Sequence, residues 1–175
     1  NNIDHWFLPF VIRELSALKN IINEIGNTKV RNFLLLGFSN VIIPISNQDS
    51  ETRYVAVSKP IKKMDLFALF SKKINSMLKR NDDYALQRSN SKIKVYHDDA
   101  RKMNKVKDKS VNLILTSPPY LNTFDYYLYH KSRIHWLGFD PSEVRKNEIG
   151  CHHTANKFDV VYPKIFIKLY IKFFL

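Results

Sequence analysis

The sequence contains a single cysteine and only four glycines among its 175 residues. One cysteine excludes an internal disulfide framework and fits a reducing cytoplasm, which is where we expect the protein. A long apolar run is also missing, because the most apolar stretch, Ile165 to Leu175, is short and is broken by Lys168 and Lys172. Acidic residues are scarce as well. The 16 aspartates and glutamates against 28 lysines and arginines leave a formal net charge of +12, which favours a polyanionic partner such as DNA.

A metal site is not expected from this sequence. Cys151-His152-His153 groups the chain's one cysteine with two histidines, which are common zinc ligands. Three adjacent side chains point in divergent directions, however, and the sequence offers no further cluster of ligands. We therefore predict that the protein binds no metal.

The N-terminal half has helical periodicity. Apolar residues recur every three or four positions from Phe7 to Ile25, which predicts an amphipathic helix that ends at Gly26-Asn27. Thr28 is expected to cap a second helix that runs through Leu36 and packs against the first. The sequence leaves the far end of this second helix open between Gly37 and Pro44.

A polar stretch separates these helices from a third helical pattern. Ser46 to Val57 predicts a loop or a hairpin, and Lys62 to Leu86 predicts a helix that breaks or frays at Asn81-Asp82-Asp83. The basic residues of this helix are expected either to lie along DNA or simply to face solvent; they are Lys72, Lys73, Lys79 and Arg80. A further helix is predicted to end at Gly138.

Two strands are predicted in the C-terminal half. Lys92 to His97 is a short strand candidate, and Val111 to Leu115 has the length and branching of a buried strand. A proline lacks the amide that a central ladder needs, so pairing must stop at Ser117. In an open parallel sheet the ligand crevice lies at the carboxyl ends of the strands, so Asp98-Asp99 is placed either to contact a cofactor or to cap the segment that follows.

The stretch from Thr116 to Tyr120 is the most informative about chemistry. Pro118 and Pro119 have no amide hydrogen, so this turn presents carbonyl oxygens, and the Ser117 hydroxyl adds another acceptor. Such a cluster suits a flat group with an exocyclic NH2, because Ser117 and the Pro118 carbonyl can accept its two hydrogens while the Tyr120 ring stacks on it. Facing an activated methyl group, that nitrogen would be methylated without a covalent enzyme intermediate.

This pentapeptide resembles the catalytic motif of the amino-directed DNA methyltransferases, in the Ser-Pro-Pro-Tyr form usual in the N4-cytosine branch. The similarity extends to the flanking segments, from Val95 to Leu115 before the motif and through Leu121 to Tyr127 and His135 to Gly138 after it. The resemblance implies an α/β fold. We expect a helical N-terminal unit with a polar insert loop in residues 1–90, followed by a partial Rossmann-like methyltransferase sheet in residues 91–175.

The resemblance also implies a reaction, a cofactor and a substrate. It implies site-specific methyl transfer from S-adenosylmethionine to the N4 of a cytosine flipped from double-stranded DNA, as in restriction-modification. Ser117, Pro118, Pro119 and Tyr120 would be catalytic, Asp99 and then Asp98 would contact the cofactor, and Tyr120, Arg53 and Tyr126 would contact DNA. N6-adenine methylation is the nearest alternative, and a non-catalytic DNA-binding remnant is the alternative of another class.

The sequence departs from the family in its glycines. A complete member has an Asp-Pro-Phe-x-Gly-x-Gly turn that holds the cofactor, and none of Gly26, Gly37, Gly138 and Gly150 is arranged in this way. We therefore expect a fragment of a longer methyltransferase, or a degenerate reading frame. The chain alone is expected to be inactive, or to need a second polypeptide that carries the missing cofactor-binding half.

Overall fold

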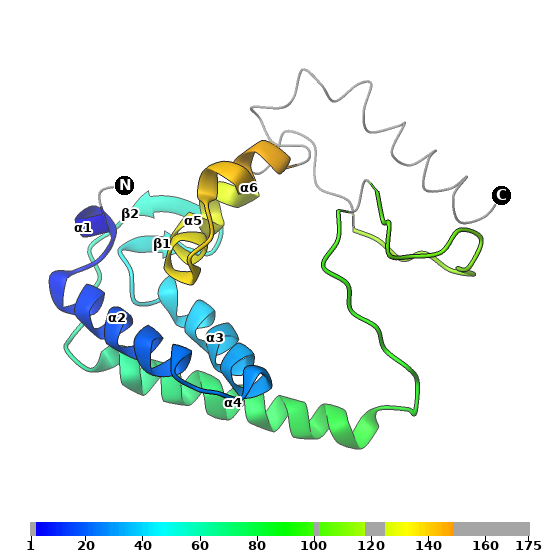
Figure 1. The fold of residues 1–175 in the computed structure, drawn as a ribbon. Coiled ribbons are helices and arrows are strands. Elements are labelled where there is room, and N and C mark those ends of the chain that lie inside the picture. The colour runs from blue at the N-terminus through cyan, green and yellow to red at the C-terminus, as the bar shows by residue number, and fades with distance from the viewer. Residues whose placement is uncertain (1–2, 100–101, 118–124, 149–175) are drawn as a thin grey trace. The chain divides into compact units, whose positions relative to one another are not determined.

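The computed structural model of the chain describes residues 3–99, 102–117 and 125–148. By their contacts the residues form two units, Asn1–Ser89 with Tyr127–Lys146, and Asn90–Tyr126 with Asn147–Leu175. The break at Ser89 falls within the linker that the polar run Arg88 to Ser91 suggests. The described elements are α1 (Ile3–Trp6), α2 (Pro9–Asn23), α3 (Thr28–Ile42), β1 (Gln48–Ser50), β2 (Arg53–Ala56), α4 (Asp65–Gln87), α5 (Tyr126–Leu137) and α6 (Pro141–Asn147) (Figure 1).

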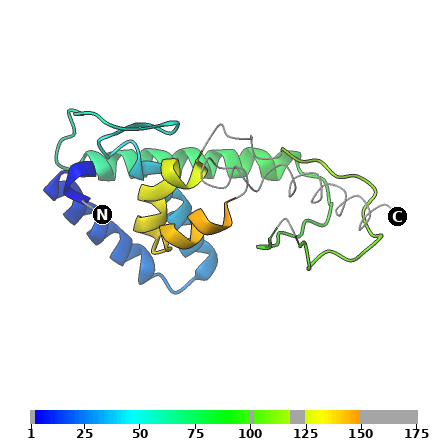
Figure 2. The ribbon, with the colours of Figure 1, turned by 90° about the horizontal axis from the view of Figure 1, so that it is seen from above.

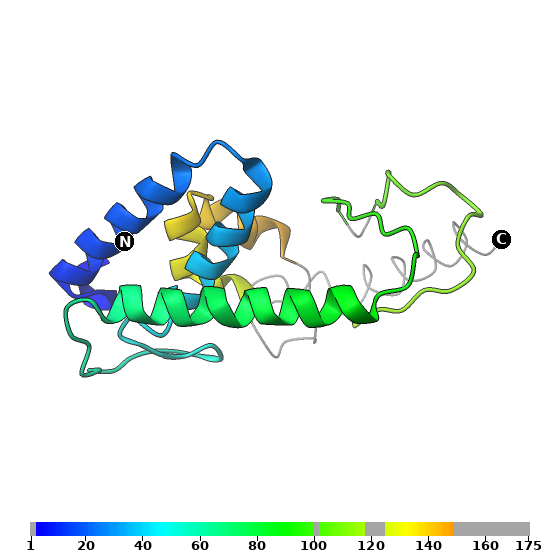
Figure 3. The same ribbon diagram turned by 90° about the horizontal axis from the view of Figure 1, so that it is seen from below.

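The predicted first helix is confirmed as α2. Pro9 stands in its first turn, where a missing amide costs little, and Leu8 precedes it in an extended conformation. Its apolar stripe is buried; the buried residues are Val11, Leu15, Leu18 and Ile22. Helices α2, α3 and α4 lie against one another, as Figure 3 shows from below. The expected helical unit therefore forms, and its core lies between these three helices.

Helix α3 is confirmed, but its predicted cap is wrong. Asn27, not Thr28, caps the helix, because the Asn27 side chain accepts hydrogen bonds from the amides of Lys29 and Val30 at 3.0 and 3.2 Å. The helix then continues to Ile42. Its β-branched last turn is stabilised by tertiary packing, since Val41 and Ile42 are fully buried.

Helix α4 is confirmed and runs without a break to Gln87, so the predicted interruption at Asn81-Asp82-Asp83 is wrong. Its first turn is fixed by Asp65, whose carboxylate accepts a hydrogen bond from the Lys62 amide at 2.7 Å. Beyond Leu78 every residue of the helix is exposed. Exposed polar residues of ordinary helix propensity cost only tenths of a kcal/mol each, which is too little to end a helix of this length.

The polar stretch after α3 forms a hairpin, one of its two predicted forms. Strands β1 and β2 pair antiparallel, with Gln48 opposite Ala56 and Ser50 opposite Arg53. The hairpin is tied to α1, because the Asn47 amide donates to the Trp6 carbonyl at 2.8 Å.

Helix α5 belongs to the same core as the N-terminal helices. Its Trp136 packs edge-on against Phe7 and Phe38, with ring centroids 5.7 and 6.4 Å apart. The helix ends at Gly138 as predicted, and a φ of +87° explains the glycine there. Figure 2 shows α5 beside α3 from above. Residues 127–146 therefore pack with the N-terminal residues, although they follow the Thr116–Tyr120 motif in the sequence.

The predicted strands Lys92–His97 and Val111–Leu115 do not form. Both segments lack regular structure, and Leu113 and Leu115 are 80% and 96% exposed. A strand is stable only when a neighbour satisfies its backbone groups, and no described residue pairs with either segment. Across the described residues, the sheet consists of β1 and β2 alone, and the partial Rossmann-like sheet stays a prediction.

No helix in the described part of the chain is both long enough and apolar enough to cross a membrane.

Candidate functional site

The predicted catalytic turn lies partly within the described residues. Thr116 and Ser117 are exposed and follow the irregular, mostly exposed run 111–115. The Ser117 hydroxyl makes no hydrogen bond within the described part of the chain, so its lone pairs are available to a ligand. Pro118, Pro119 and Tyr120 lie outside the described residues, and the acceptor cluster that they would complete stays a prediction.

Asp98 organises the loop that follows the first predicted strand. One carboxylate oxygen accepts a hydrogen bond from the Asp99 amide at 2.9 Å, and the other accepts from the Lys105 amide at 3.1 Å. The Lys105 side chain returns to the same loop and donates to the His97 carbonyl at 2.7 Å. The hydrogen bond from the Lys105 amide is the main reason why the pKa of Asp98 lies below its ordinary value. Asp98 is therefore an ionised acceptor with its position fixed by backbone amides.

Asp99 takes a different part in this loop. Its backbone carbonyl accepts hydrogen bonds from the amides of Lys102 and Met103 at 2.9 and 2.8 Å, and its side chain is partly buried. Met103 has a φ of +45°, so a tight turn follows and no helix begins there. No helix forms over residues 102–106, so the expected helix cap is wrong there, and the cofactor contact of Asp98 and Asp99 stays a prediction.

The two predicted DNA contacts outside the motif are both accessible. Arg53 is the first residue of β2, and its exposed guanidinium lies 3.4 Å from the Asp49 carboxylate. Tyr126 is the first residue of α5 and is 37% exposed. An exposed ion pair of this kind contributes little to stability. Replacing the contact with Asp49 by a contact with a phosphate would therefore cost Arg53 little free energy.

Metal ligands do not gather in the described part of the chain: no group of three or more histidine, cysteine, aspartate or glutamate side chains is placed to hold a metal ion. Cys151-His152-His153 lies outside the described residues.

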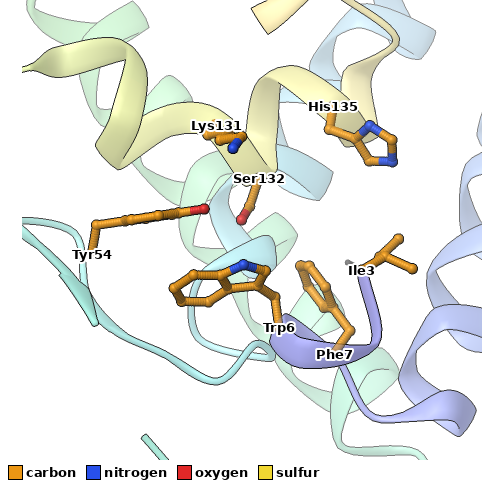
Figure 4. Close-up of a pocket in the computed structure, with 7 residues that line it drawn as sticks. All are labelled: Ile3, Trp6, Phe7, Tyr54, Lys131, Ser132 and His135. Atoms are coloured by element: carbon orange, nitrogen blue, oxygen red, sulfur yellow. The ribbon is translucent and has the colours of Figure 1, made fainter. Parts of the chain in front are cut away.

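A cavity of about 210 Å³ lies in the first unit, between α1, β2 and α5. Aromatic rings of Trp6, Phe7 and Tyr54 form much of its wall, and Lys131, Ser132 and His135 face it from α5 (Figure 4). Trp6 and Tyr54 contact each other with ring centroids 4.4 Å apart and planes inclined by 31°. The cavity therefore has an aromatic base and a polar, cationic upper wall.

Hydrogen bonds hold the three walls of this cavity together. The Asn47 bond to the Trp6 carbonyl joins α1 to the hairpin, and the Gln48 side-chain amide donates to the Tyr129 carbonyl at 3.3 Å, joining the hairpin to α5. Lys59, in the segment after β2, donates to the carbonyls of Ile43 and Gln48 and so ties the hairpin to the end of α3. Burial lowers the pKa of Lys59, while Asp49 and Glu51 act in the opposite direction.

A second polar network fixes α5 from its other side. The Arg133 guanidinium donates to the Ser39 carbonyl at 2.9 Å and also to the Glu51 carboxylate, which ties α5 to α3 and to the hairpin turn. It also lies 3.1 Å from Nδ1 of His130. Burial and, after it, the Arg133 charge lower the pKa of His130, with Glu51 opposing them. His130 is therefore neutral at pH 7.

The cavity residues were not foreseen as a site from the sequence. Their segments, 3–7, 54 and 131–135, lie far apart in the chain, and no spacing rule connects them. The available signals were weak: a tryptophan next to a phenylalanine before the first long helix, and Lys131 and His135 at i and i+4 on one helix face.

Comparison of the chain with protein-family models, with curated proteins and with solved structures finds no match.

Proposed function

We propose that the chain is part of an S-adenosylmethionine-dependent DNA methyltransferase that methylates the exocyclic N4 of cytosine. The observation that carries this proposal is the pentapeptide Thr116 to Tyr120. Ser117 and the Pro118 carbonyl would accept hydrogen bonds from the amino group of a flipped base, Pro119 would stiffen the turn, and Tyr120 would stack on the base. The Ser117 hydroxyl is exposed and forms no hydrogen bond among the residues that the structure describes, which supports this role, since a catalytic acceptor must be reachable by substrate.

Asp98 and Asp99 would contribute acceptors to the cofactor, and the ionised, amide-held carboxylate of Asp98 supports this. The missing glycine-rich turn would be supplied by a second polypeptide. This arrangement belongs to an α/β fold of the Rossmann-like methyltransferase type, in which the segment that includes Leu113 and Leu115 would be a strand.

The surface charge supports a DNA partner. Four cationic side chains are exposed along α4 and form no ion pair among the described residues; they are Lys72, Lys73, Lys79 and Arg80. Residues seven apart on a helix lie on the same face, so these four form two adjacent stripes, 72 with 79 and 73 with 80. Together with Arg53 they would contact phosphates, and each lost contact should reduce the salt dependence of binding by about one ion.

The decisive experiment measures binding of labelled S-adenosylmethionine and methyl transfer to DNA, with the chain alone and with an added polypeptide that carries the Asp-Pro-Phe-x-Gly-x-Gly element. We expect N4-methylcytosine in the digested DNA, and a loss of transfer on the order of 10²-fold in S117A because one transition-state hydrogen bond is removed. The matched control S76A changes an exposed serine of α4 and should transfer normally.

Two outcomes favour the alternatives. N6-methyladenine in place of N4-methylcytosine would move the target to adenine, because both bases present the same kind of amino group. DNA binding without any binding of S-adenosylmethionine, even with the added polypeptide, would favour the non-catalytic DNA-binding remnant, which the absence of a glycine-rich turn in the sequence also favours. Equal transfer by S117A and S76A would refute the role of the motif.

A further inference from the structure

The cavity between α1, β2 and α5 has polar groups whose hydrogen-bonding capacity is unused. Within the described part of the chain, the hydroxyls of Tyr54 and Ser132 and the ammonium of Lys131 form no hydrogen bond or ion pair. Ser132 is 7% exposed as a whole residue, but its hydroxyl faces the cavity and stays accessible from it. A ligand in the cavity would therefore bond to these three groups without breaking an existing hydrogen bond.

The three polar groups converge on the same end of the cavity. In Figure 4 the Tyr54 hydroxyl, the Lys131 ammonium and the Ser132 hydroxyl lie together above the Trp6 ring, while His135 and Ile3 lie at the opposite end. Burial raises the pKa of Tyr54 above its ordinary value, so its phenol is protonated and can donate at neutral pH. The convergent end therefore offers one cation and two hydroxyl donors, and no acidic side chain lines the cavity.

The shape and the walls restrict what this end can bind. A cavity of about 150 Å³ is known to accept benzene, so the 210 Å³ here suits one six-membered ring with a small substituent. The faces of Trp6 and Phe7 would contact that ring, since aromatic pairs favour offset or edge-on contacts. The substituent would be anionic, because a Lys131 ammonium with two hydroxyls is a good set of donors for a carboxylate or phosphate.

We propose that the cavity bounded by Trp6, Tyr54 and Lys131 is a binding site for a single-ring aromatic compound that carries an anionic group. The anion is held by Lys131, Tyr54 and Ser132, and the ring lies against Trp6 and Phe7. This site is independent of methyl transfer, since all of its residues belong to the first unit and none to the Thr116–Tyr120 motif.

The test titrates the full chain with benzoate, benzamide and benzylamine, three probes with the same ring and a negative, neutral or positive substituent. Binding is followed by calorimetry and by tryptophan fluorescence, because Trp6 lies in the cavity wall and Trp136 in the adjacent core. Benzoate is expected to bind saturably, at least tenfold more tightly than benzamide, with no measurable binding of benzylamine. A charge-assisted hydrogen bond accounts for a difference of this size.

Variants separate the site from general attraction to a basic protein. K131M should reduce benzoate affinity tenfold or more, and Y54F, which keeps the ring but removes the hydroxyl, should reduce it severalfold. K63M removes an exposed lysine that precedes α4 and has no part in the cavity, and it should bind benzoate normally. Equal affinities for benzoate and benzamide, or equal losses in K131M and K63M, would overturn the proposal. So would the lack of saturable benzoate binding by a chain whose far-ultraviolet circular dichroism shows it folded.

Discussion

Gly37 of α3 lies directly against side chains of α4, and substituting it with alanine tests the packing of the first unit. A Cβ at position 37 would lie 2.4 Å from Cδ1 of Ile74 and 3.4 Å from Cε2 of Phe70. To reach the 3.4 Å edge of ordinary contact, the Ile74 methyl group must retreat by about 1 Å. Gly37 is buried, so a displacement of this kind disturbs neighbouring side chains in a close-packed region.

Two opposing free energies decide the outcome of G37A. Overpacking by one methyl group costs about 1–3 kcal/mol, whereas replacing glycine by alanine inside a helix gains about 1 kcal/mol. The net expectation is a loss of about 1 kcal/mol in the free energy of unfolding. In an I74V background the offending Cδ1 is absent, and the nearest atoms are then at ordinary contact distance. There the helix propensity should prevail, and G37A should raise stability by about 0.5–1 kcal/mol.

The assay is urea unfolding of the four proteins of this double-mutant cycle, followed by far-ultraviolet circular dichroism, with the free energies compared at equal slope. G26A is the control for a general glycine effect, since a Cβ at Gly26 meets nothing within 4 Å; it should be neutral or slightly stabilising. The change of sign between the two backgrounds is the essential result. If G37A lowers stability equally with Ile74 and with Val at position 74, the close approach of α3 and α4 is not the cause and the packing described above is wrong.

Two further predictions concern the Asn27 cap of α3 and the depressed pKa of His130 on α5. N27A removes the acceptor of the hydrogen bonds from Lys29 and Val30 and should lower stability by about 1 kcal/mol in thermal or urea unfolding, while N27D should keep most of it; equal losses in both variants would contradict the cap. The pKa of His130 is depressed below its ordinary value of 6.5 by burial and Arg133, so its neutral state stabilises the fold fully above about pH 6.5, and this contribution falls as the pH drops through the depressed pKa. Between pH 7.5 and pH 5.5 the melting temperature of H130Q should therefore fall less than that of the native chain. An identical pH dependence of the two proteins would show that His130 does not cause the loss of stability.

The helices of the first unit could be predicted because their signal is local. The stripe of Val11, Leu15, Leu18 and Ile22 repeats with the helical period and is buried as that period requires. Gly138 likewise marks the end of α5, since a left-handed residue must follow the last turn. The cap at Asn27 could not be distinguished from one at Thr28, because both residue types cap helices and adjacent positions differ only in backbone geometry.

The cavity could not be predicted because it depends on tertiary placement. Trp6, Tyr54 and Lys131 each have an ordinary local role, at the end of a short helix, in a hairpin strand and on a helix surface. Contacts between distant segments bring the three elements to one place, among them the Asn47 and Gln48 hydrogen bonds and the contact of the Trp6 and Tyr54 rings. Sequence patterns report which face of an element is apolar, but they do not report which distant face it meets.

The strand predicted at Val111 to Leu115 also depends on tertiary placement, because a strand needs neighbours that a local pattern cannot identify. Its odd residues, Val111, Leu113 and Leu115, would share one face of a strand, and burying a leucine side chain fully is worth about 1.5–3 kcal/mol. That free energy is available only if neighbouring strands cover the face and accept the backbone hydrogen bonds, and no described residue does so. Leu113 and Leu115, just before Ser117, are 80% and 96% exposed. This exposure is expected for the proposed methyltransferase if its remaining strands come from another polypeptide. The same pattern that predicts a strand therefore makes its formation conditional on neighbouring strands that cover this face.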